Sequence, residues 1–257
     1  MRFKWCGTAT VLFESGESRL LVDPYLRKLS VPPALTQEEA RSADAIFITH
    51  PHLDHFADID AFSEGTTPVY VSNTGIALAR KNGLAVQCMR PVAAGDTVRA
   101  GAFTVRAFAA RHCRFDLLTV LRVLFSARTW RYFKDTLRLL RGAAAFRIRR
   151  KDVLAFEISD NDKRVLLFGS ADFLRGERYP QECDVLLFPY QGRTRPERAL
   201  ARVLKATRPQ AVAIDHFDDA FPPVTYRVDT AHFLPTAGQQ TPPPRAFEPA
   251  EGVWYEI

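Results

Sequence analysis

The chain of 257 residues has only four cysteines, and they lie far apart, at Cys6, Cys88, Cys113 and Cys183. No two of them form a Cys-x-x-Cys pair, so the sequence lacks the pattern of a disulfide framework. Disulfides are rare where thiols are kept reduced. We therefore expect a cytoplasmic setting for this chain.

Long hydrophobic runs are also missing. No stretch of about 18 apolar residues occurs, so no membrane-spanning helix is expected. The N-terminus has no charged segment followed by a long apolar one, so we expect no secretory signal peptide. Apolar residues still make up 47% of the chain, which is ample for a packed core. The length suits one large α/β domain or two small ones.

Positive charge is confined to one part of the chain. The segment 114–151 contains eleven Lys/Arg and two Asp, a balance of +9. Since the whole chain carries +6, the remainder carries −3. The basic character therefore belongs to this segment and not to the rest of the chain.

Three of the six histidines are concentrated just after an apolar run, Ala45–Ile48, that predicts a buried strand. In extended chain, residues two apart point to the same side, so His50, His52 and Asp54 can face one point. His55 joins them from the next turn. Imidazole and carboxylate groups suit zinc and similar divalent ions. The stretch therefore predicts a metal site.

A His-x-His-x-Asp-His stretch after a strand resembles the signature of the metallo-β-lactamase fold superfamily. The resemblance implies an α/β (αββα) fold, a four-layer sandwich of two β-sheets with helices on both outer faces. It also implies a dinuclear metallohydrolase with its metals at one edge of the sheets. We expect residues 1–257 to form a single domain of this type, with a helical insertion at about 114–151.

The same resemblance implies the remaining ligands. His112 follows the predicted strand 103–110, Asp172 follows Gly-Ser-Ala, and His216 follows the predicted strand 211–214. One metal would be held by His50, His52 and His112, the other by Asp54, His55 and His216, with Asp172 between them. Taken alone, a histidine at a strand end is typical of a structural or solvated residue, and such an aspartate of a turn or helix cap. The expected cofactor is two divalent ions, zinc first, with manganese or iron as alternatives.

Asp23, in an Asp-Pro pair after an early hairpin, matches a superfamily position that supports the ligand histidines. Its role would be to fix the orientation and tautomer of an imidazole. The alternative is an ordinary turn aspartate before proline. Related members often carry Gly-His-Ala where this chain has Gly7-Thr8-Ala9, so any role of that histidine is absent here.

The implied chemistry is hydrolysis. Two metals would share a bridging water with a lowered pKa, and the resulting hydroxide would be the nucleophile. Asp54 would orient it and is the expected catalytic residue.

Differences from other branches of the superfamily at ligand positions limit the possible substrate classes. Aspartate instead of cysteine at 172 argues against the antibiotic-hydrolysing branch, and histidine instead of glutamate at 52 argues against the diiron oxidoreductases. Only 43 residues separate Asp172 from His216, too few for the cap domain of the nuclease branch. The early Asp23-Pro24 pair and the late Asp215-His216-Phe217 stretch resemble the motifs of ascorbate-6-phosphate lactonases and N-acyl-phosphatidylethanolamine phospholipases D. We therefore expect a phosphodiester, a phosphorylated metabolite or a lactone as substrate.

The basic segment predicts two amphipathic helices, over 115–125 and 129–141. In the second, a basic stripe adjoins an apolar one, so we expect a lid or docking element with the residues Trp130, Arg131, Phe133, Lys134 and Arg138. Such a surface suits a lipid-like or small anionic substrate, a peripheral membrane contact, or a partner subunit in a homo-oligomer. The alternative is a hairpin packed on the domain.

Two other functions remain open. A metal-dependent nuclease would use the basic insert, but its apolar stripes make nucleic acid the less favoured partner. A non-catalytic metal-binding interaction protein is the third reading, and the filled ligand set argues against it.

Overall fold

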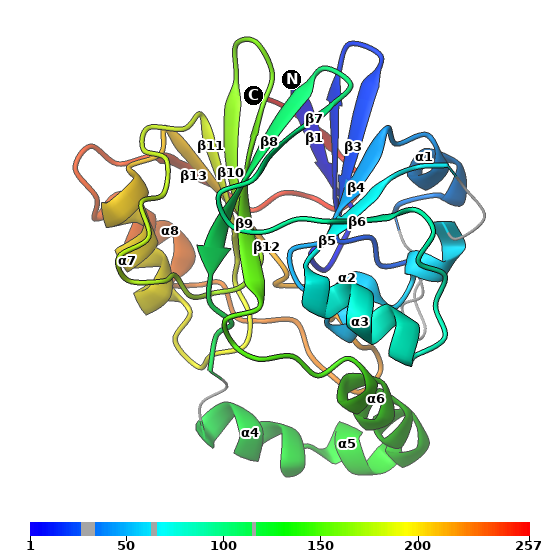
Figure 1. The fold of residues 1–257 in the computed structure, drawn as a ribbon. Helices are drawn as coiled ribbons and strands as arrows, with labels where there is room; N and C mark the ends of the chain where they lie inside the picture. Colours follow the sequence, from blue (N-terminus) through cyan, green and yellow to red (C-terminus); the bar gives the residue numbers. More distant parts are fainter. Residues whose placement is uncertain (27–33, 63–65, 115–116) are drawn as a thin grey trace.

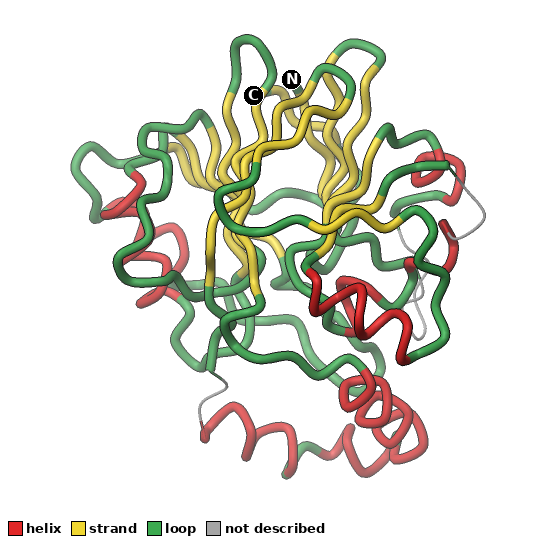
Figure 2. Tube along the Cα trace, in the orientation of Figure 1, coloured by secondary structure: helices red, strands yellow, loops and turns green. Residues whose placement is uncertain are grey.

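Two seven-stranded β-sheets pack face to face in the computed structural model, which describes residues 1–26, 34–62, 66–114 and 117–257 (Figure 1). Helices cover the outer face of each sheet, as the ribbon and the tube both show (Figure 2). The expected αββα sandwich is therefore confirmed. Aromatic rings fill the space between the sheets, where Phe47 of the first contacts Phe156 of the second at a ring-centroid distance of 5.4 Å.

The first sheet has the strand order β14-β1-β2-β3-β4-β5-β6. Its strands are β1 Arg2–Trp5, β2 Val11–Ser15, β3 Ser18–Val22, β4 Ala45–Phe47, β5 Val69–Val71, β6 Met89–Pro91 and β14 Trp254–Glu256. The β2–β3 hairpin turns tightly at Gly16, whose φ of 59° is the left-handed conformation that glycine adopts without a steric cost. From β3 to β6 the strands run parallel.

The second sheet has the order β13-β12-β11-β10-β9-β8-β7. Its strands are β7 Thr97–Ala100, β8 Phe103–Ala110, β9 Val153–Ser159, β10 Arg164–Phe168, β11 Val185–Pro189, β12 Ala211–Asp215 and β13 Arg245–Phe247. The predicted strand 103–110 is confirmed as β8, which pairs with β7 and β9 and so belongs to the second sheet. The alternation of apolar and polar residues along a strand indicates which side chains are buried, but it does not indicate which sheet the strand joins.

The outer helices lie on opposite sides of the sandwich. On the first sheet's side are α1 Gln37–Arg41, α2 Leu53–Phe56 and α3 Asn73–Lys81, and on the second sheet's side are α7 Glu197–Thr207 and α8 Phe233–Gly238. Helix α7 buries Leu200, Val203, Leu204 and Thr207, the three-and-four spacing of one apolar face. After α2 the chain forms a separate 3-10 turn, Ile59–Phe62.

The basic segment between β8 and β9 forms α4 Leu117–Leu124, α5 Ala127–Arg131 and α6 Phe133–Ala145, beyond one end of the sandwich (Figure 1). The first predicted helix began at Phe115, which with Asp116 lies outside the described residues. The prediction of one helix over 129–141 is wrong, because the chain leaves helical geometry at Tyr132 (φ −111°, ψ 45°). The Thr129 hydroxyl donates to the Val123 carbonyl and the Thr136 hydroxyl to the Thr129 carbonyl, which stabilises the bend. Among the described residues, none of the helices combines the length and hydrophobicity needed to cross a bilayer.

Candidate metal centre

Five chain segments bring the candidate residues together. Four of them lie at or just after strand ends: Asp23 directly follows β3, His216 directly follows β12, His50 lies three residues after β4 and His112 two residues after β8. Helix α2 begins after His52, so Asp54 and His55 lie in its single turn. Polar side chains can gather here because each strand's buried apolar run has ended at this edge.

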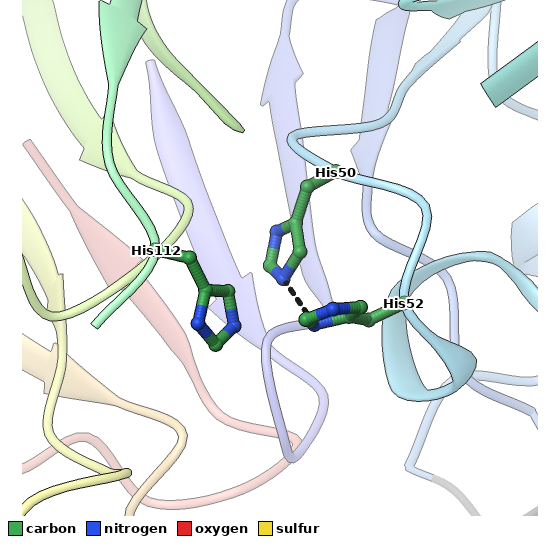
Figure 3. Close-up of side chains that lie close together, drawn as sticks. All are labelled: His50, His52 and His112. Carbon is green, nitrogen blue, oxygen red and sulfur yellow. Dashed lines mark hydrogen bonds between the residues drawn. The ribbon is translucent and has the colours of Figure 1, made fainter. Parts of the chain in front are cut away.

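His50, His52 and His112 form the first donor group, with one ring nitrogen of each within 4.8 Å of the others. Figure 3 shows the three rings facing one another, two from the segment before α2 and one from the end of β8. His50 Nε2 lies 3.1 Å from His52 Nδ1. The Nδ1 atom of His112 is 2.8 Å from the Cys113 carbonyl, and a hydrogen bond there leaves Nε2 of the neutral ring with a lone pair that could bind a metal.

Asp54, His55 and His216 form the second group, within the same 4.8 Å limit. Asp54 Oδ2 is 3.0 Å from His216 Nε2 and 3.9 Å from His55 Nε2. His216 has a left-handed backbone (φ 55°), and its amide donates to the Thr8 carbonyl at 2.8 Å. The Thr8 amide in turn donates to the Asp218 carboxylate at 3.0 Å. The position where related members often carry histidine therefore helps to hold His216 in this chain.

Asp23 is a buried acceptor that contacts the site from behind. It accepts hydrogen bonds from the Thr49 amide at 2.7 Å, the Thr49 hydroxyl at 2.5 Å and His55 Nδ1 at 2.7 Å. Because His55 donates through Nδ1, its Nε2 is left to bind a metal. A Cβ atom on Gly169 would lie 2.4 Å from Thr49 Cβ, so glycine is required where the end of β10 packs on Thr49.

The two groups differ in protonation. Burial lowers the pKa of His50 well below its ordinary value, and burial together with His112 lowers the pKa of His52 to about 3. Burial also tends to lower the pKa of His55, but the carboxylates of Asp23 and Asp54 outweigh it and raise that pKa to about 8. The imidazoles of the first group are thus neutral and ready to bind, whereas His55 must release a proton.

Zinc binding to the second group should therefore weaken on acidification, while binding to the first group persists. Below the His55 pKa of about 8, zinc competes with a proton, so its affinity should fall about tenfold per pH unit. A competition titration of metal-stripped protein with a chromophoric chelator, between about pH 6 and pH 9, measures both affinities. Parallel loss of both sites over this range would contradict the assignment.

Asp172, predicted to bridge the two metals, belongs to neither group. Its Oδ2 atom pairs with Arg193 Nη2 at 2.8 Å and with Arg150 Nη2 at 3.3 Å. The bridging role stays a prediction. Thr49, Arg150 and Arg193 did not emerge from the sequence; the position of Thr49 beside the histidine motif was the one available signal.

The insertion contacts two segments that neighbour the candidate ligands, one beside His52 and one after His216. A Cβ atom on Gly142 of α6 would lie 3.0 Å from Leu53, the residue between His52 and Asp54. Arg128 of α5 donates to the Thr225 carbonyl at 2.6 Å and pairs with Asp219 at 3.3 Å, in the segment after His216. All five predicted lid residues, Trp130, Arg131, Phe133, Lys134 and Arg138, are exposed.

Comparison with known proteins finds one family model, the beta-lactamase superfamily domain, which matches residues 11–217. A UPF0173 protein of Pyrococcus furiosus is 28% identical over 113 residues, which are 44% of this chain and 50% of that protein. A UPF0173 metal-dependent hydrolase of Salinibacter ruber is 29% identical over 112 residues, 44% of this chain and 49% of that one. The matches thus span about half the length of these curated relatives.

Two solved structures share the fold over the full chain. Igni18, a metallo hydrolase of Ignicoccus hospitalis, superposes with a TM-score of 0.64 at 17% identity, covering 100% of this chain and 98% of that one. An isothiocyanate hydrolase from Delia radicum gut bacteria gives 0.64 at 14% identity, covering 100% and 99%. At these identities the likeness concerns the fold alone.

Proposed function

The chain belongs to the beta-lactamase superfamily domain family, and on this premise we propose that it is a metal-dependent hydrolase that binds two divalent ions, zinc first. The observation that carries the proposal is the pair of three-residue donor groups, each within 4.8 Å. Several curated relatives are named metal-dependent hydrolases, which supports the reaction class.

The donor chemistry fits the proposed ions. Five imidazoles and one carboxylate are a set that zinc, manganese and iron all accept. His50, His52 and His112 would hold one ion, and Asp54, His55 and His216 the other. When bound, such ions supply Lewis acidity and a water molecule of lowered pKa.

The chain's own residues orient these groups. Asp23 holds His55 through Nδ1, and the Thr8 carbonyl holds the backbone of His216. Asp54 faces both histidines of its group and would also orient the attacking nucleophile. Asp172 would complete the set by binding between the two ions.

The proposed substrates are a phosphodiester, a phosphorylated metabolite or a lactone, and the alternatives are a nuclease or a non-catalytic metal-binding protein. The test is a screen of zinc-loaded protein against a phosphodiester, phosphorylated esters, lactones and RNA. We expect turnover of one of the first three classes, lost with a chelator and restored by zinc. Failure to bind zinc, manganese or iron would refute the proposal, and turnover of RNA alone would favour the nuclease.

We further propose that the insertion docks on an anionic lipid surface, in a cytoplasmic protein that is peripheral to the membrane. Leu117 is 71% exposed, Phe125 81% and Trp130 68%, and further exposed apolar residues of the insertion are Leu118, Leu121, Val123, Phe133 and Leu140. An apolar surface of this extent is unusual on a soluble monomer. The exposed basic residues are Arg131 on α5 and Lys134, Arg138 and Arg141 on α6, the two helices that also carry Trp130, Phe133 and Leu140.

Charge favours a lipid over a second copy of the chain. Two copies meeting through this surface would bring like charges together, whereas anionic headgroups neutralise them at about 1 kcal/mol per basic residue. The four cysteines are free thiols, which supports the cytoplasmic part of the proposal.

Reversal of the charges at Arg131, Lys134 and Arg138 to glutamate should abolish binding to vesicles that contain phosphatidylserine. Loss of about 1 kcal/mol per residue, together with repulsion, should weaken binding at least a hundredfold in co-sedimentation. The matched control is Arg198, Arg202 and Lys205 to glutamate on α7, three exposed residues with comparable helical spacing. Equal vesicle binding by both variants, or concentration-dependent dimerisation that only the first variant loses, would overturn the lipid assignment.

A further inference from the structure

Two arginines from distant parts of the chain meet at the rim of the metal centre. Arg193 follows β11, and Arg150 ends the insertion before β9. Both contact the same oxygen, Asp172 Oδ2, at 2.8 Å and 3.3 Å. Arg150 is also tied to the centre itself, since its Nε donates to the His112 carbonyl at 3.0 Å. The two guanidinium groups are therefore held beside a predicted metal ligand.

The positive charge at this point exceeds what Asp172 neutralises. Two guanidinium groups share this single carboxylate oxygen. In addition, the Nε atom of Arg193 is buried and has no hydrogen-bond partner among the described residues. A buried donor of this kind is costly unless it binds an acceptor.

We propose that Arg150 and Arg193 form a subsite that binds a phosphate group of the substrate next to the metal centre. The inference rests on the proposed hydrolase function and deepens it. Guanidinium groups bind phosphate oxygens through paired, charge-assisted hydrogen bonds, and two of them from different directions suit a tetrahedral dianion. An uncharged lactone would leave this charge uncompensated, so the subsite favours the phosphorylated substrate classes.

A competing account makes both arginines positioning residues that only hold Asp172 for metal binding. The two accounts differ in a measurable quantity. A subsite changes the affinity for phosphate at constant metal content, whereas a positioning pair changes the metal content itself. The test therefore measures both in the same samples.

The probe is inorganic phosphate, titrated calorimetrically into zinc-loaded protein whose metal content is known. Arg150→Gln and Arg193→Gln should each weaken phosphate binding by about tenfold or more, the loss of one charge-assisted contact, with zinc content unchanged. The matched controls Arg149→Gln and Arg195→Gln remove one exposed positive charge beside each and should leave the affinity within about twofold. Glycerol phosphate and vesicles containing phosphatidic acid, compared afterwards, distinguish a free metabolite from a lipid headgroup.

Unchanged phosphate affinity in both variants would mean that phosphate binds at the metals alone, and the proposal would be wrong. Lower zinc content with unchanged phosphate affinity per loaded centre would establish the positioning role instead. Failure of the hydrolase proposal is a separate result, namely wild-type protein that takes up no metal. In that case the subsite is tested in metal-free protein. There Asp172→Asn, which removes the carboxylate that pairs with both arginines, should tighten phosphate binding, and an added Arg193→Gln should cancel this gain in affinity. No gain from Asp172→Asn would overturn the subsite there.

Discussion

Replacing His52 with alanine should lower the zinc content by about one equivalent and reduce hydrolysis roughly 10³-fold, the effect of removing a principal electrostatic group from an active site. His52 belongs to the first donor group, 3.1 Å from His50, and its low pKa of about 3 makes it a neutral donor. It is only half-buried, so its loss should leave the fold intact. Elemental analysis of protein prepared without chelator, together with turnover of the substrate found in the screen, measures both effects.

The matched control is His232→Ala, because His232 is exposed and belongs to neither donor group. It should retain the full metal content and full turnover.

Asp172→Ala should also lower metal content and abolish hydrolysis if Asp172 bridges the ions. Full zinc content and full activity in His52→Ala would refute the central assignment.

Replacing Asp23 with alanine should destabilise the metal-free protein by about 3 kcal/mol or more, since it leaves three buried donors without their acceptor. These donors are the Thr49 amide, the Thr49 hydroxyl and His55 Nδ1. Metal affinity should fall as well, because the orientation of His55 is no longer fixed. The free energy of unfolding, measured with denaturant on chelated protein, separates the first effect from the second.

The destabilisation should also depend on pH in a defined direction. Asp23 helps to raise the pKa of His55 from 6.5 to about 8, so this contact contributes stability that is fully present below 6.5 and is lost as the pH rises through about 8. The cost of Asp23→Ala should therefore be larger at about pH 6 than at about pH 9. Asp162→Ala, an exposed turn aspartate, is the control and should change stability by less than about 0.5 kcal/mol. A cost for Asp23→Ala as small as that of the control would refute the buried role.

Much of the fold and four of the six donor residues are predictable from local sequence. A buried strand ends at Phe47, and the spacing of His50, His52, Asp54 and His55 brings four donors into one short stretch. In this stretch the local backbone sets the side-chain directions, because strand periodicity and a single helical turn decide where each side chain points.

His112, Asp172 and His216 are a different case. Nothing local distinguishes them from solvated or capping residues, and only the resemblance to a superfamily indicated their role. The structure brings His112 to His50 and His52 and brings His216 to Asp54, because β4, β8 and β12 end at the same edge.

By itself, the sequence determined the layered α/β class, the dense histidine stretch and the basic, apolar character of the insertion. The tertiary structure decided which sheet β7 and β8 join, where the insertion bends at Tyr132, and which groups meet at Asp172. Arg150 lies 22 residues before Asp172 in the chain, and Asp23 lies 32 residues before His55. Contacts across such separations depend on strand order and sheet packing, which no local periodicity encodes, because a side chain's direction is set locally whereas its partner is set by the whole fold.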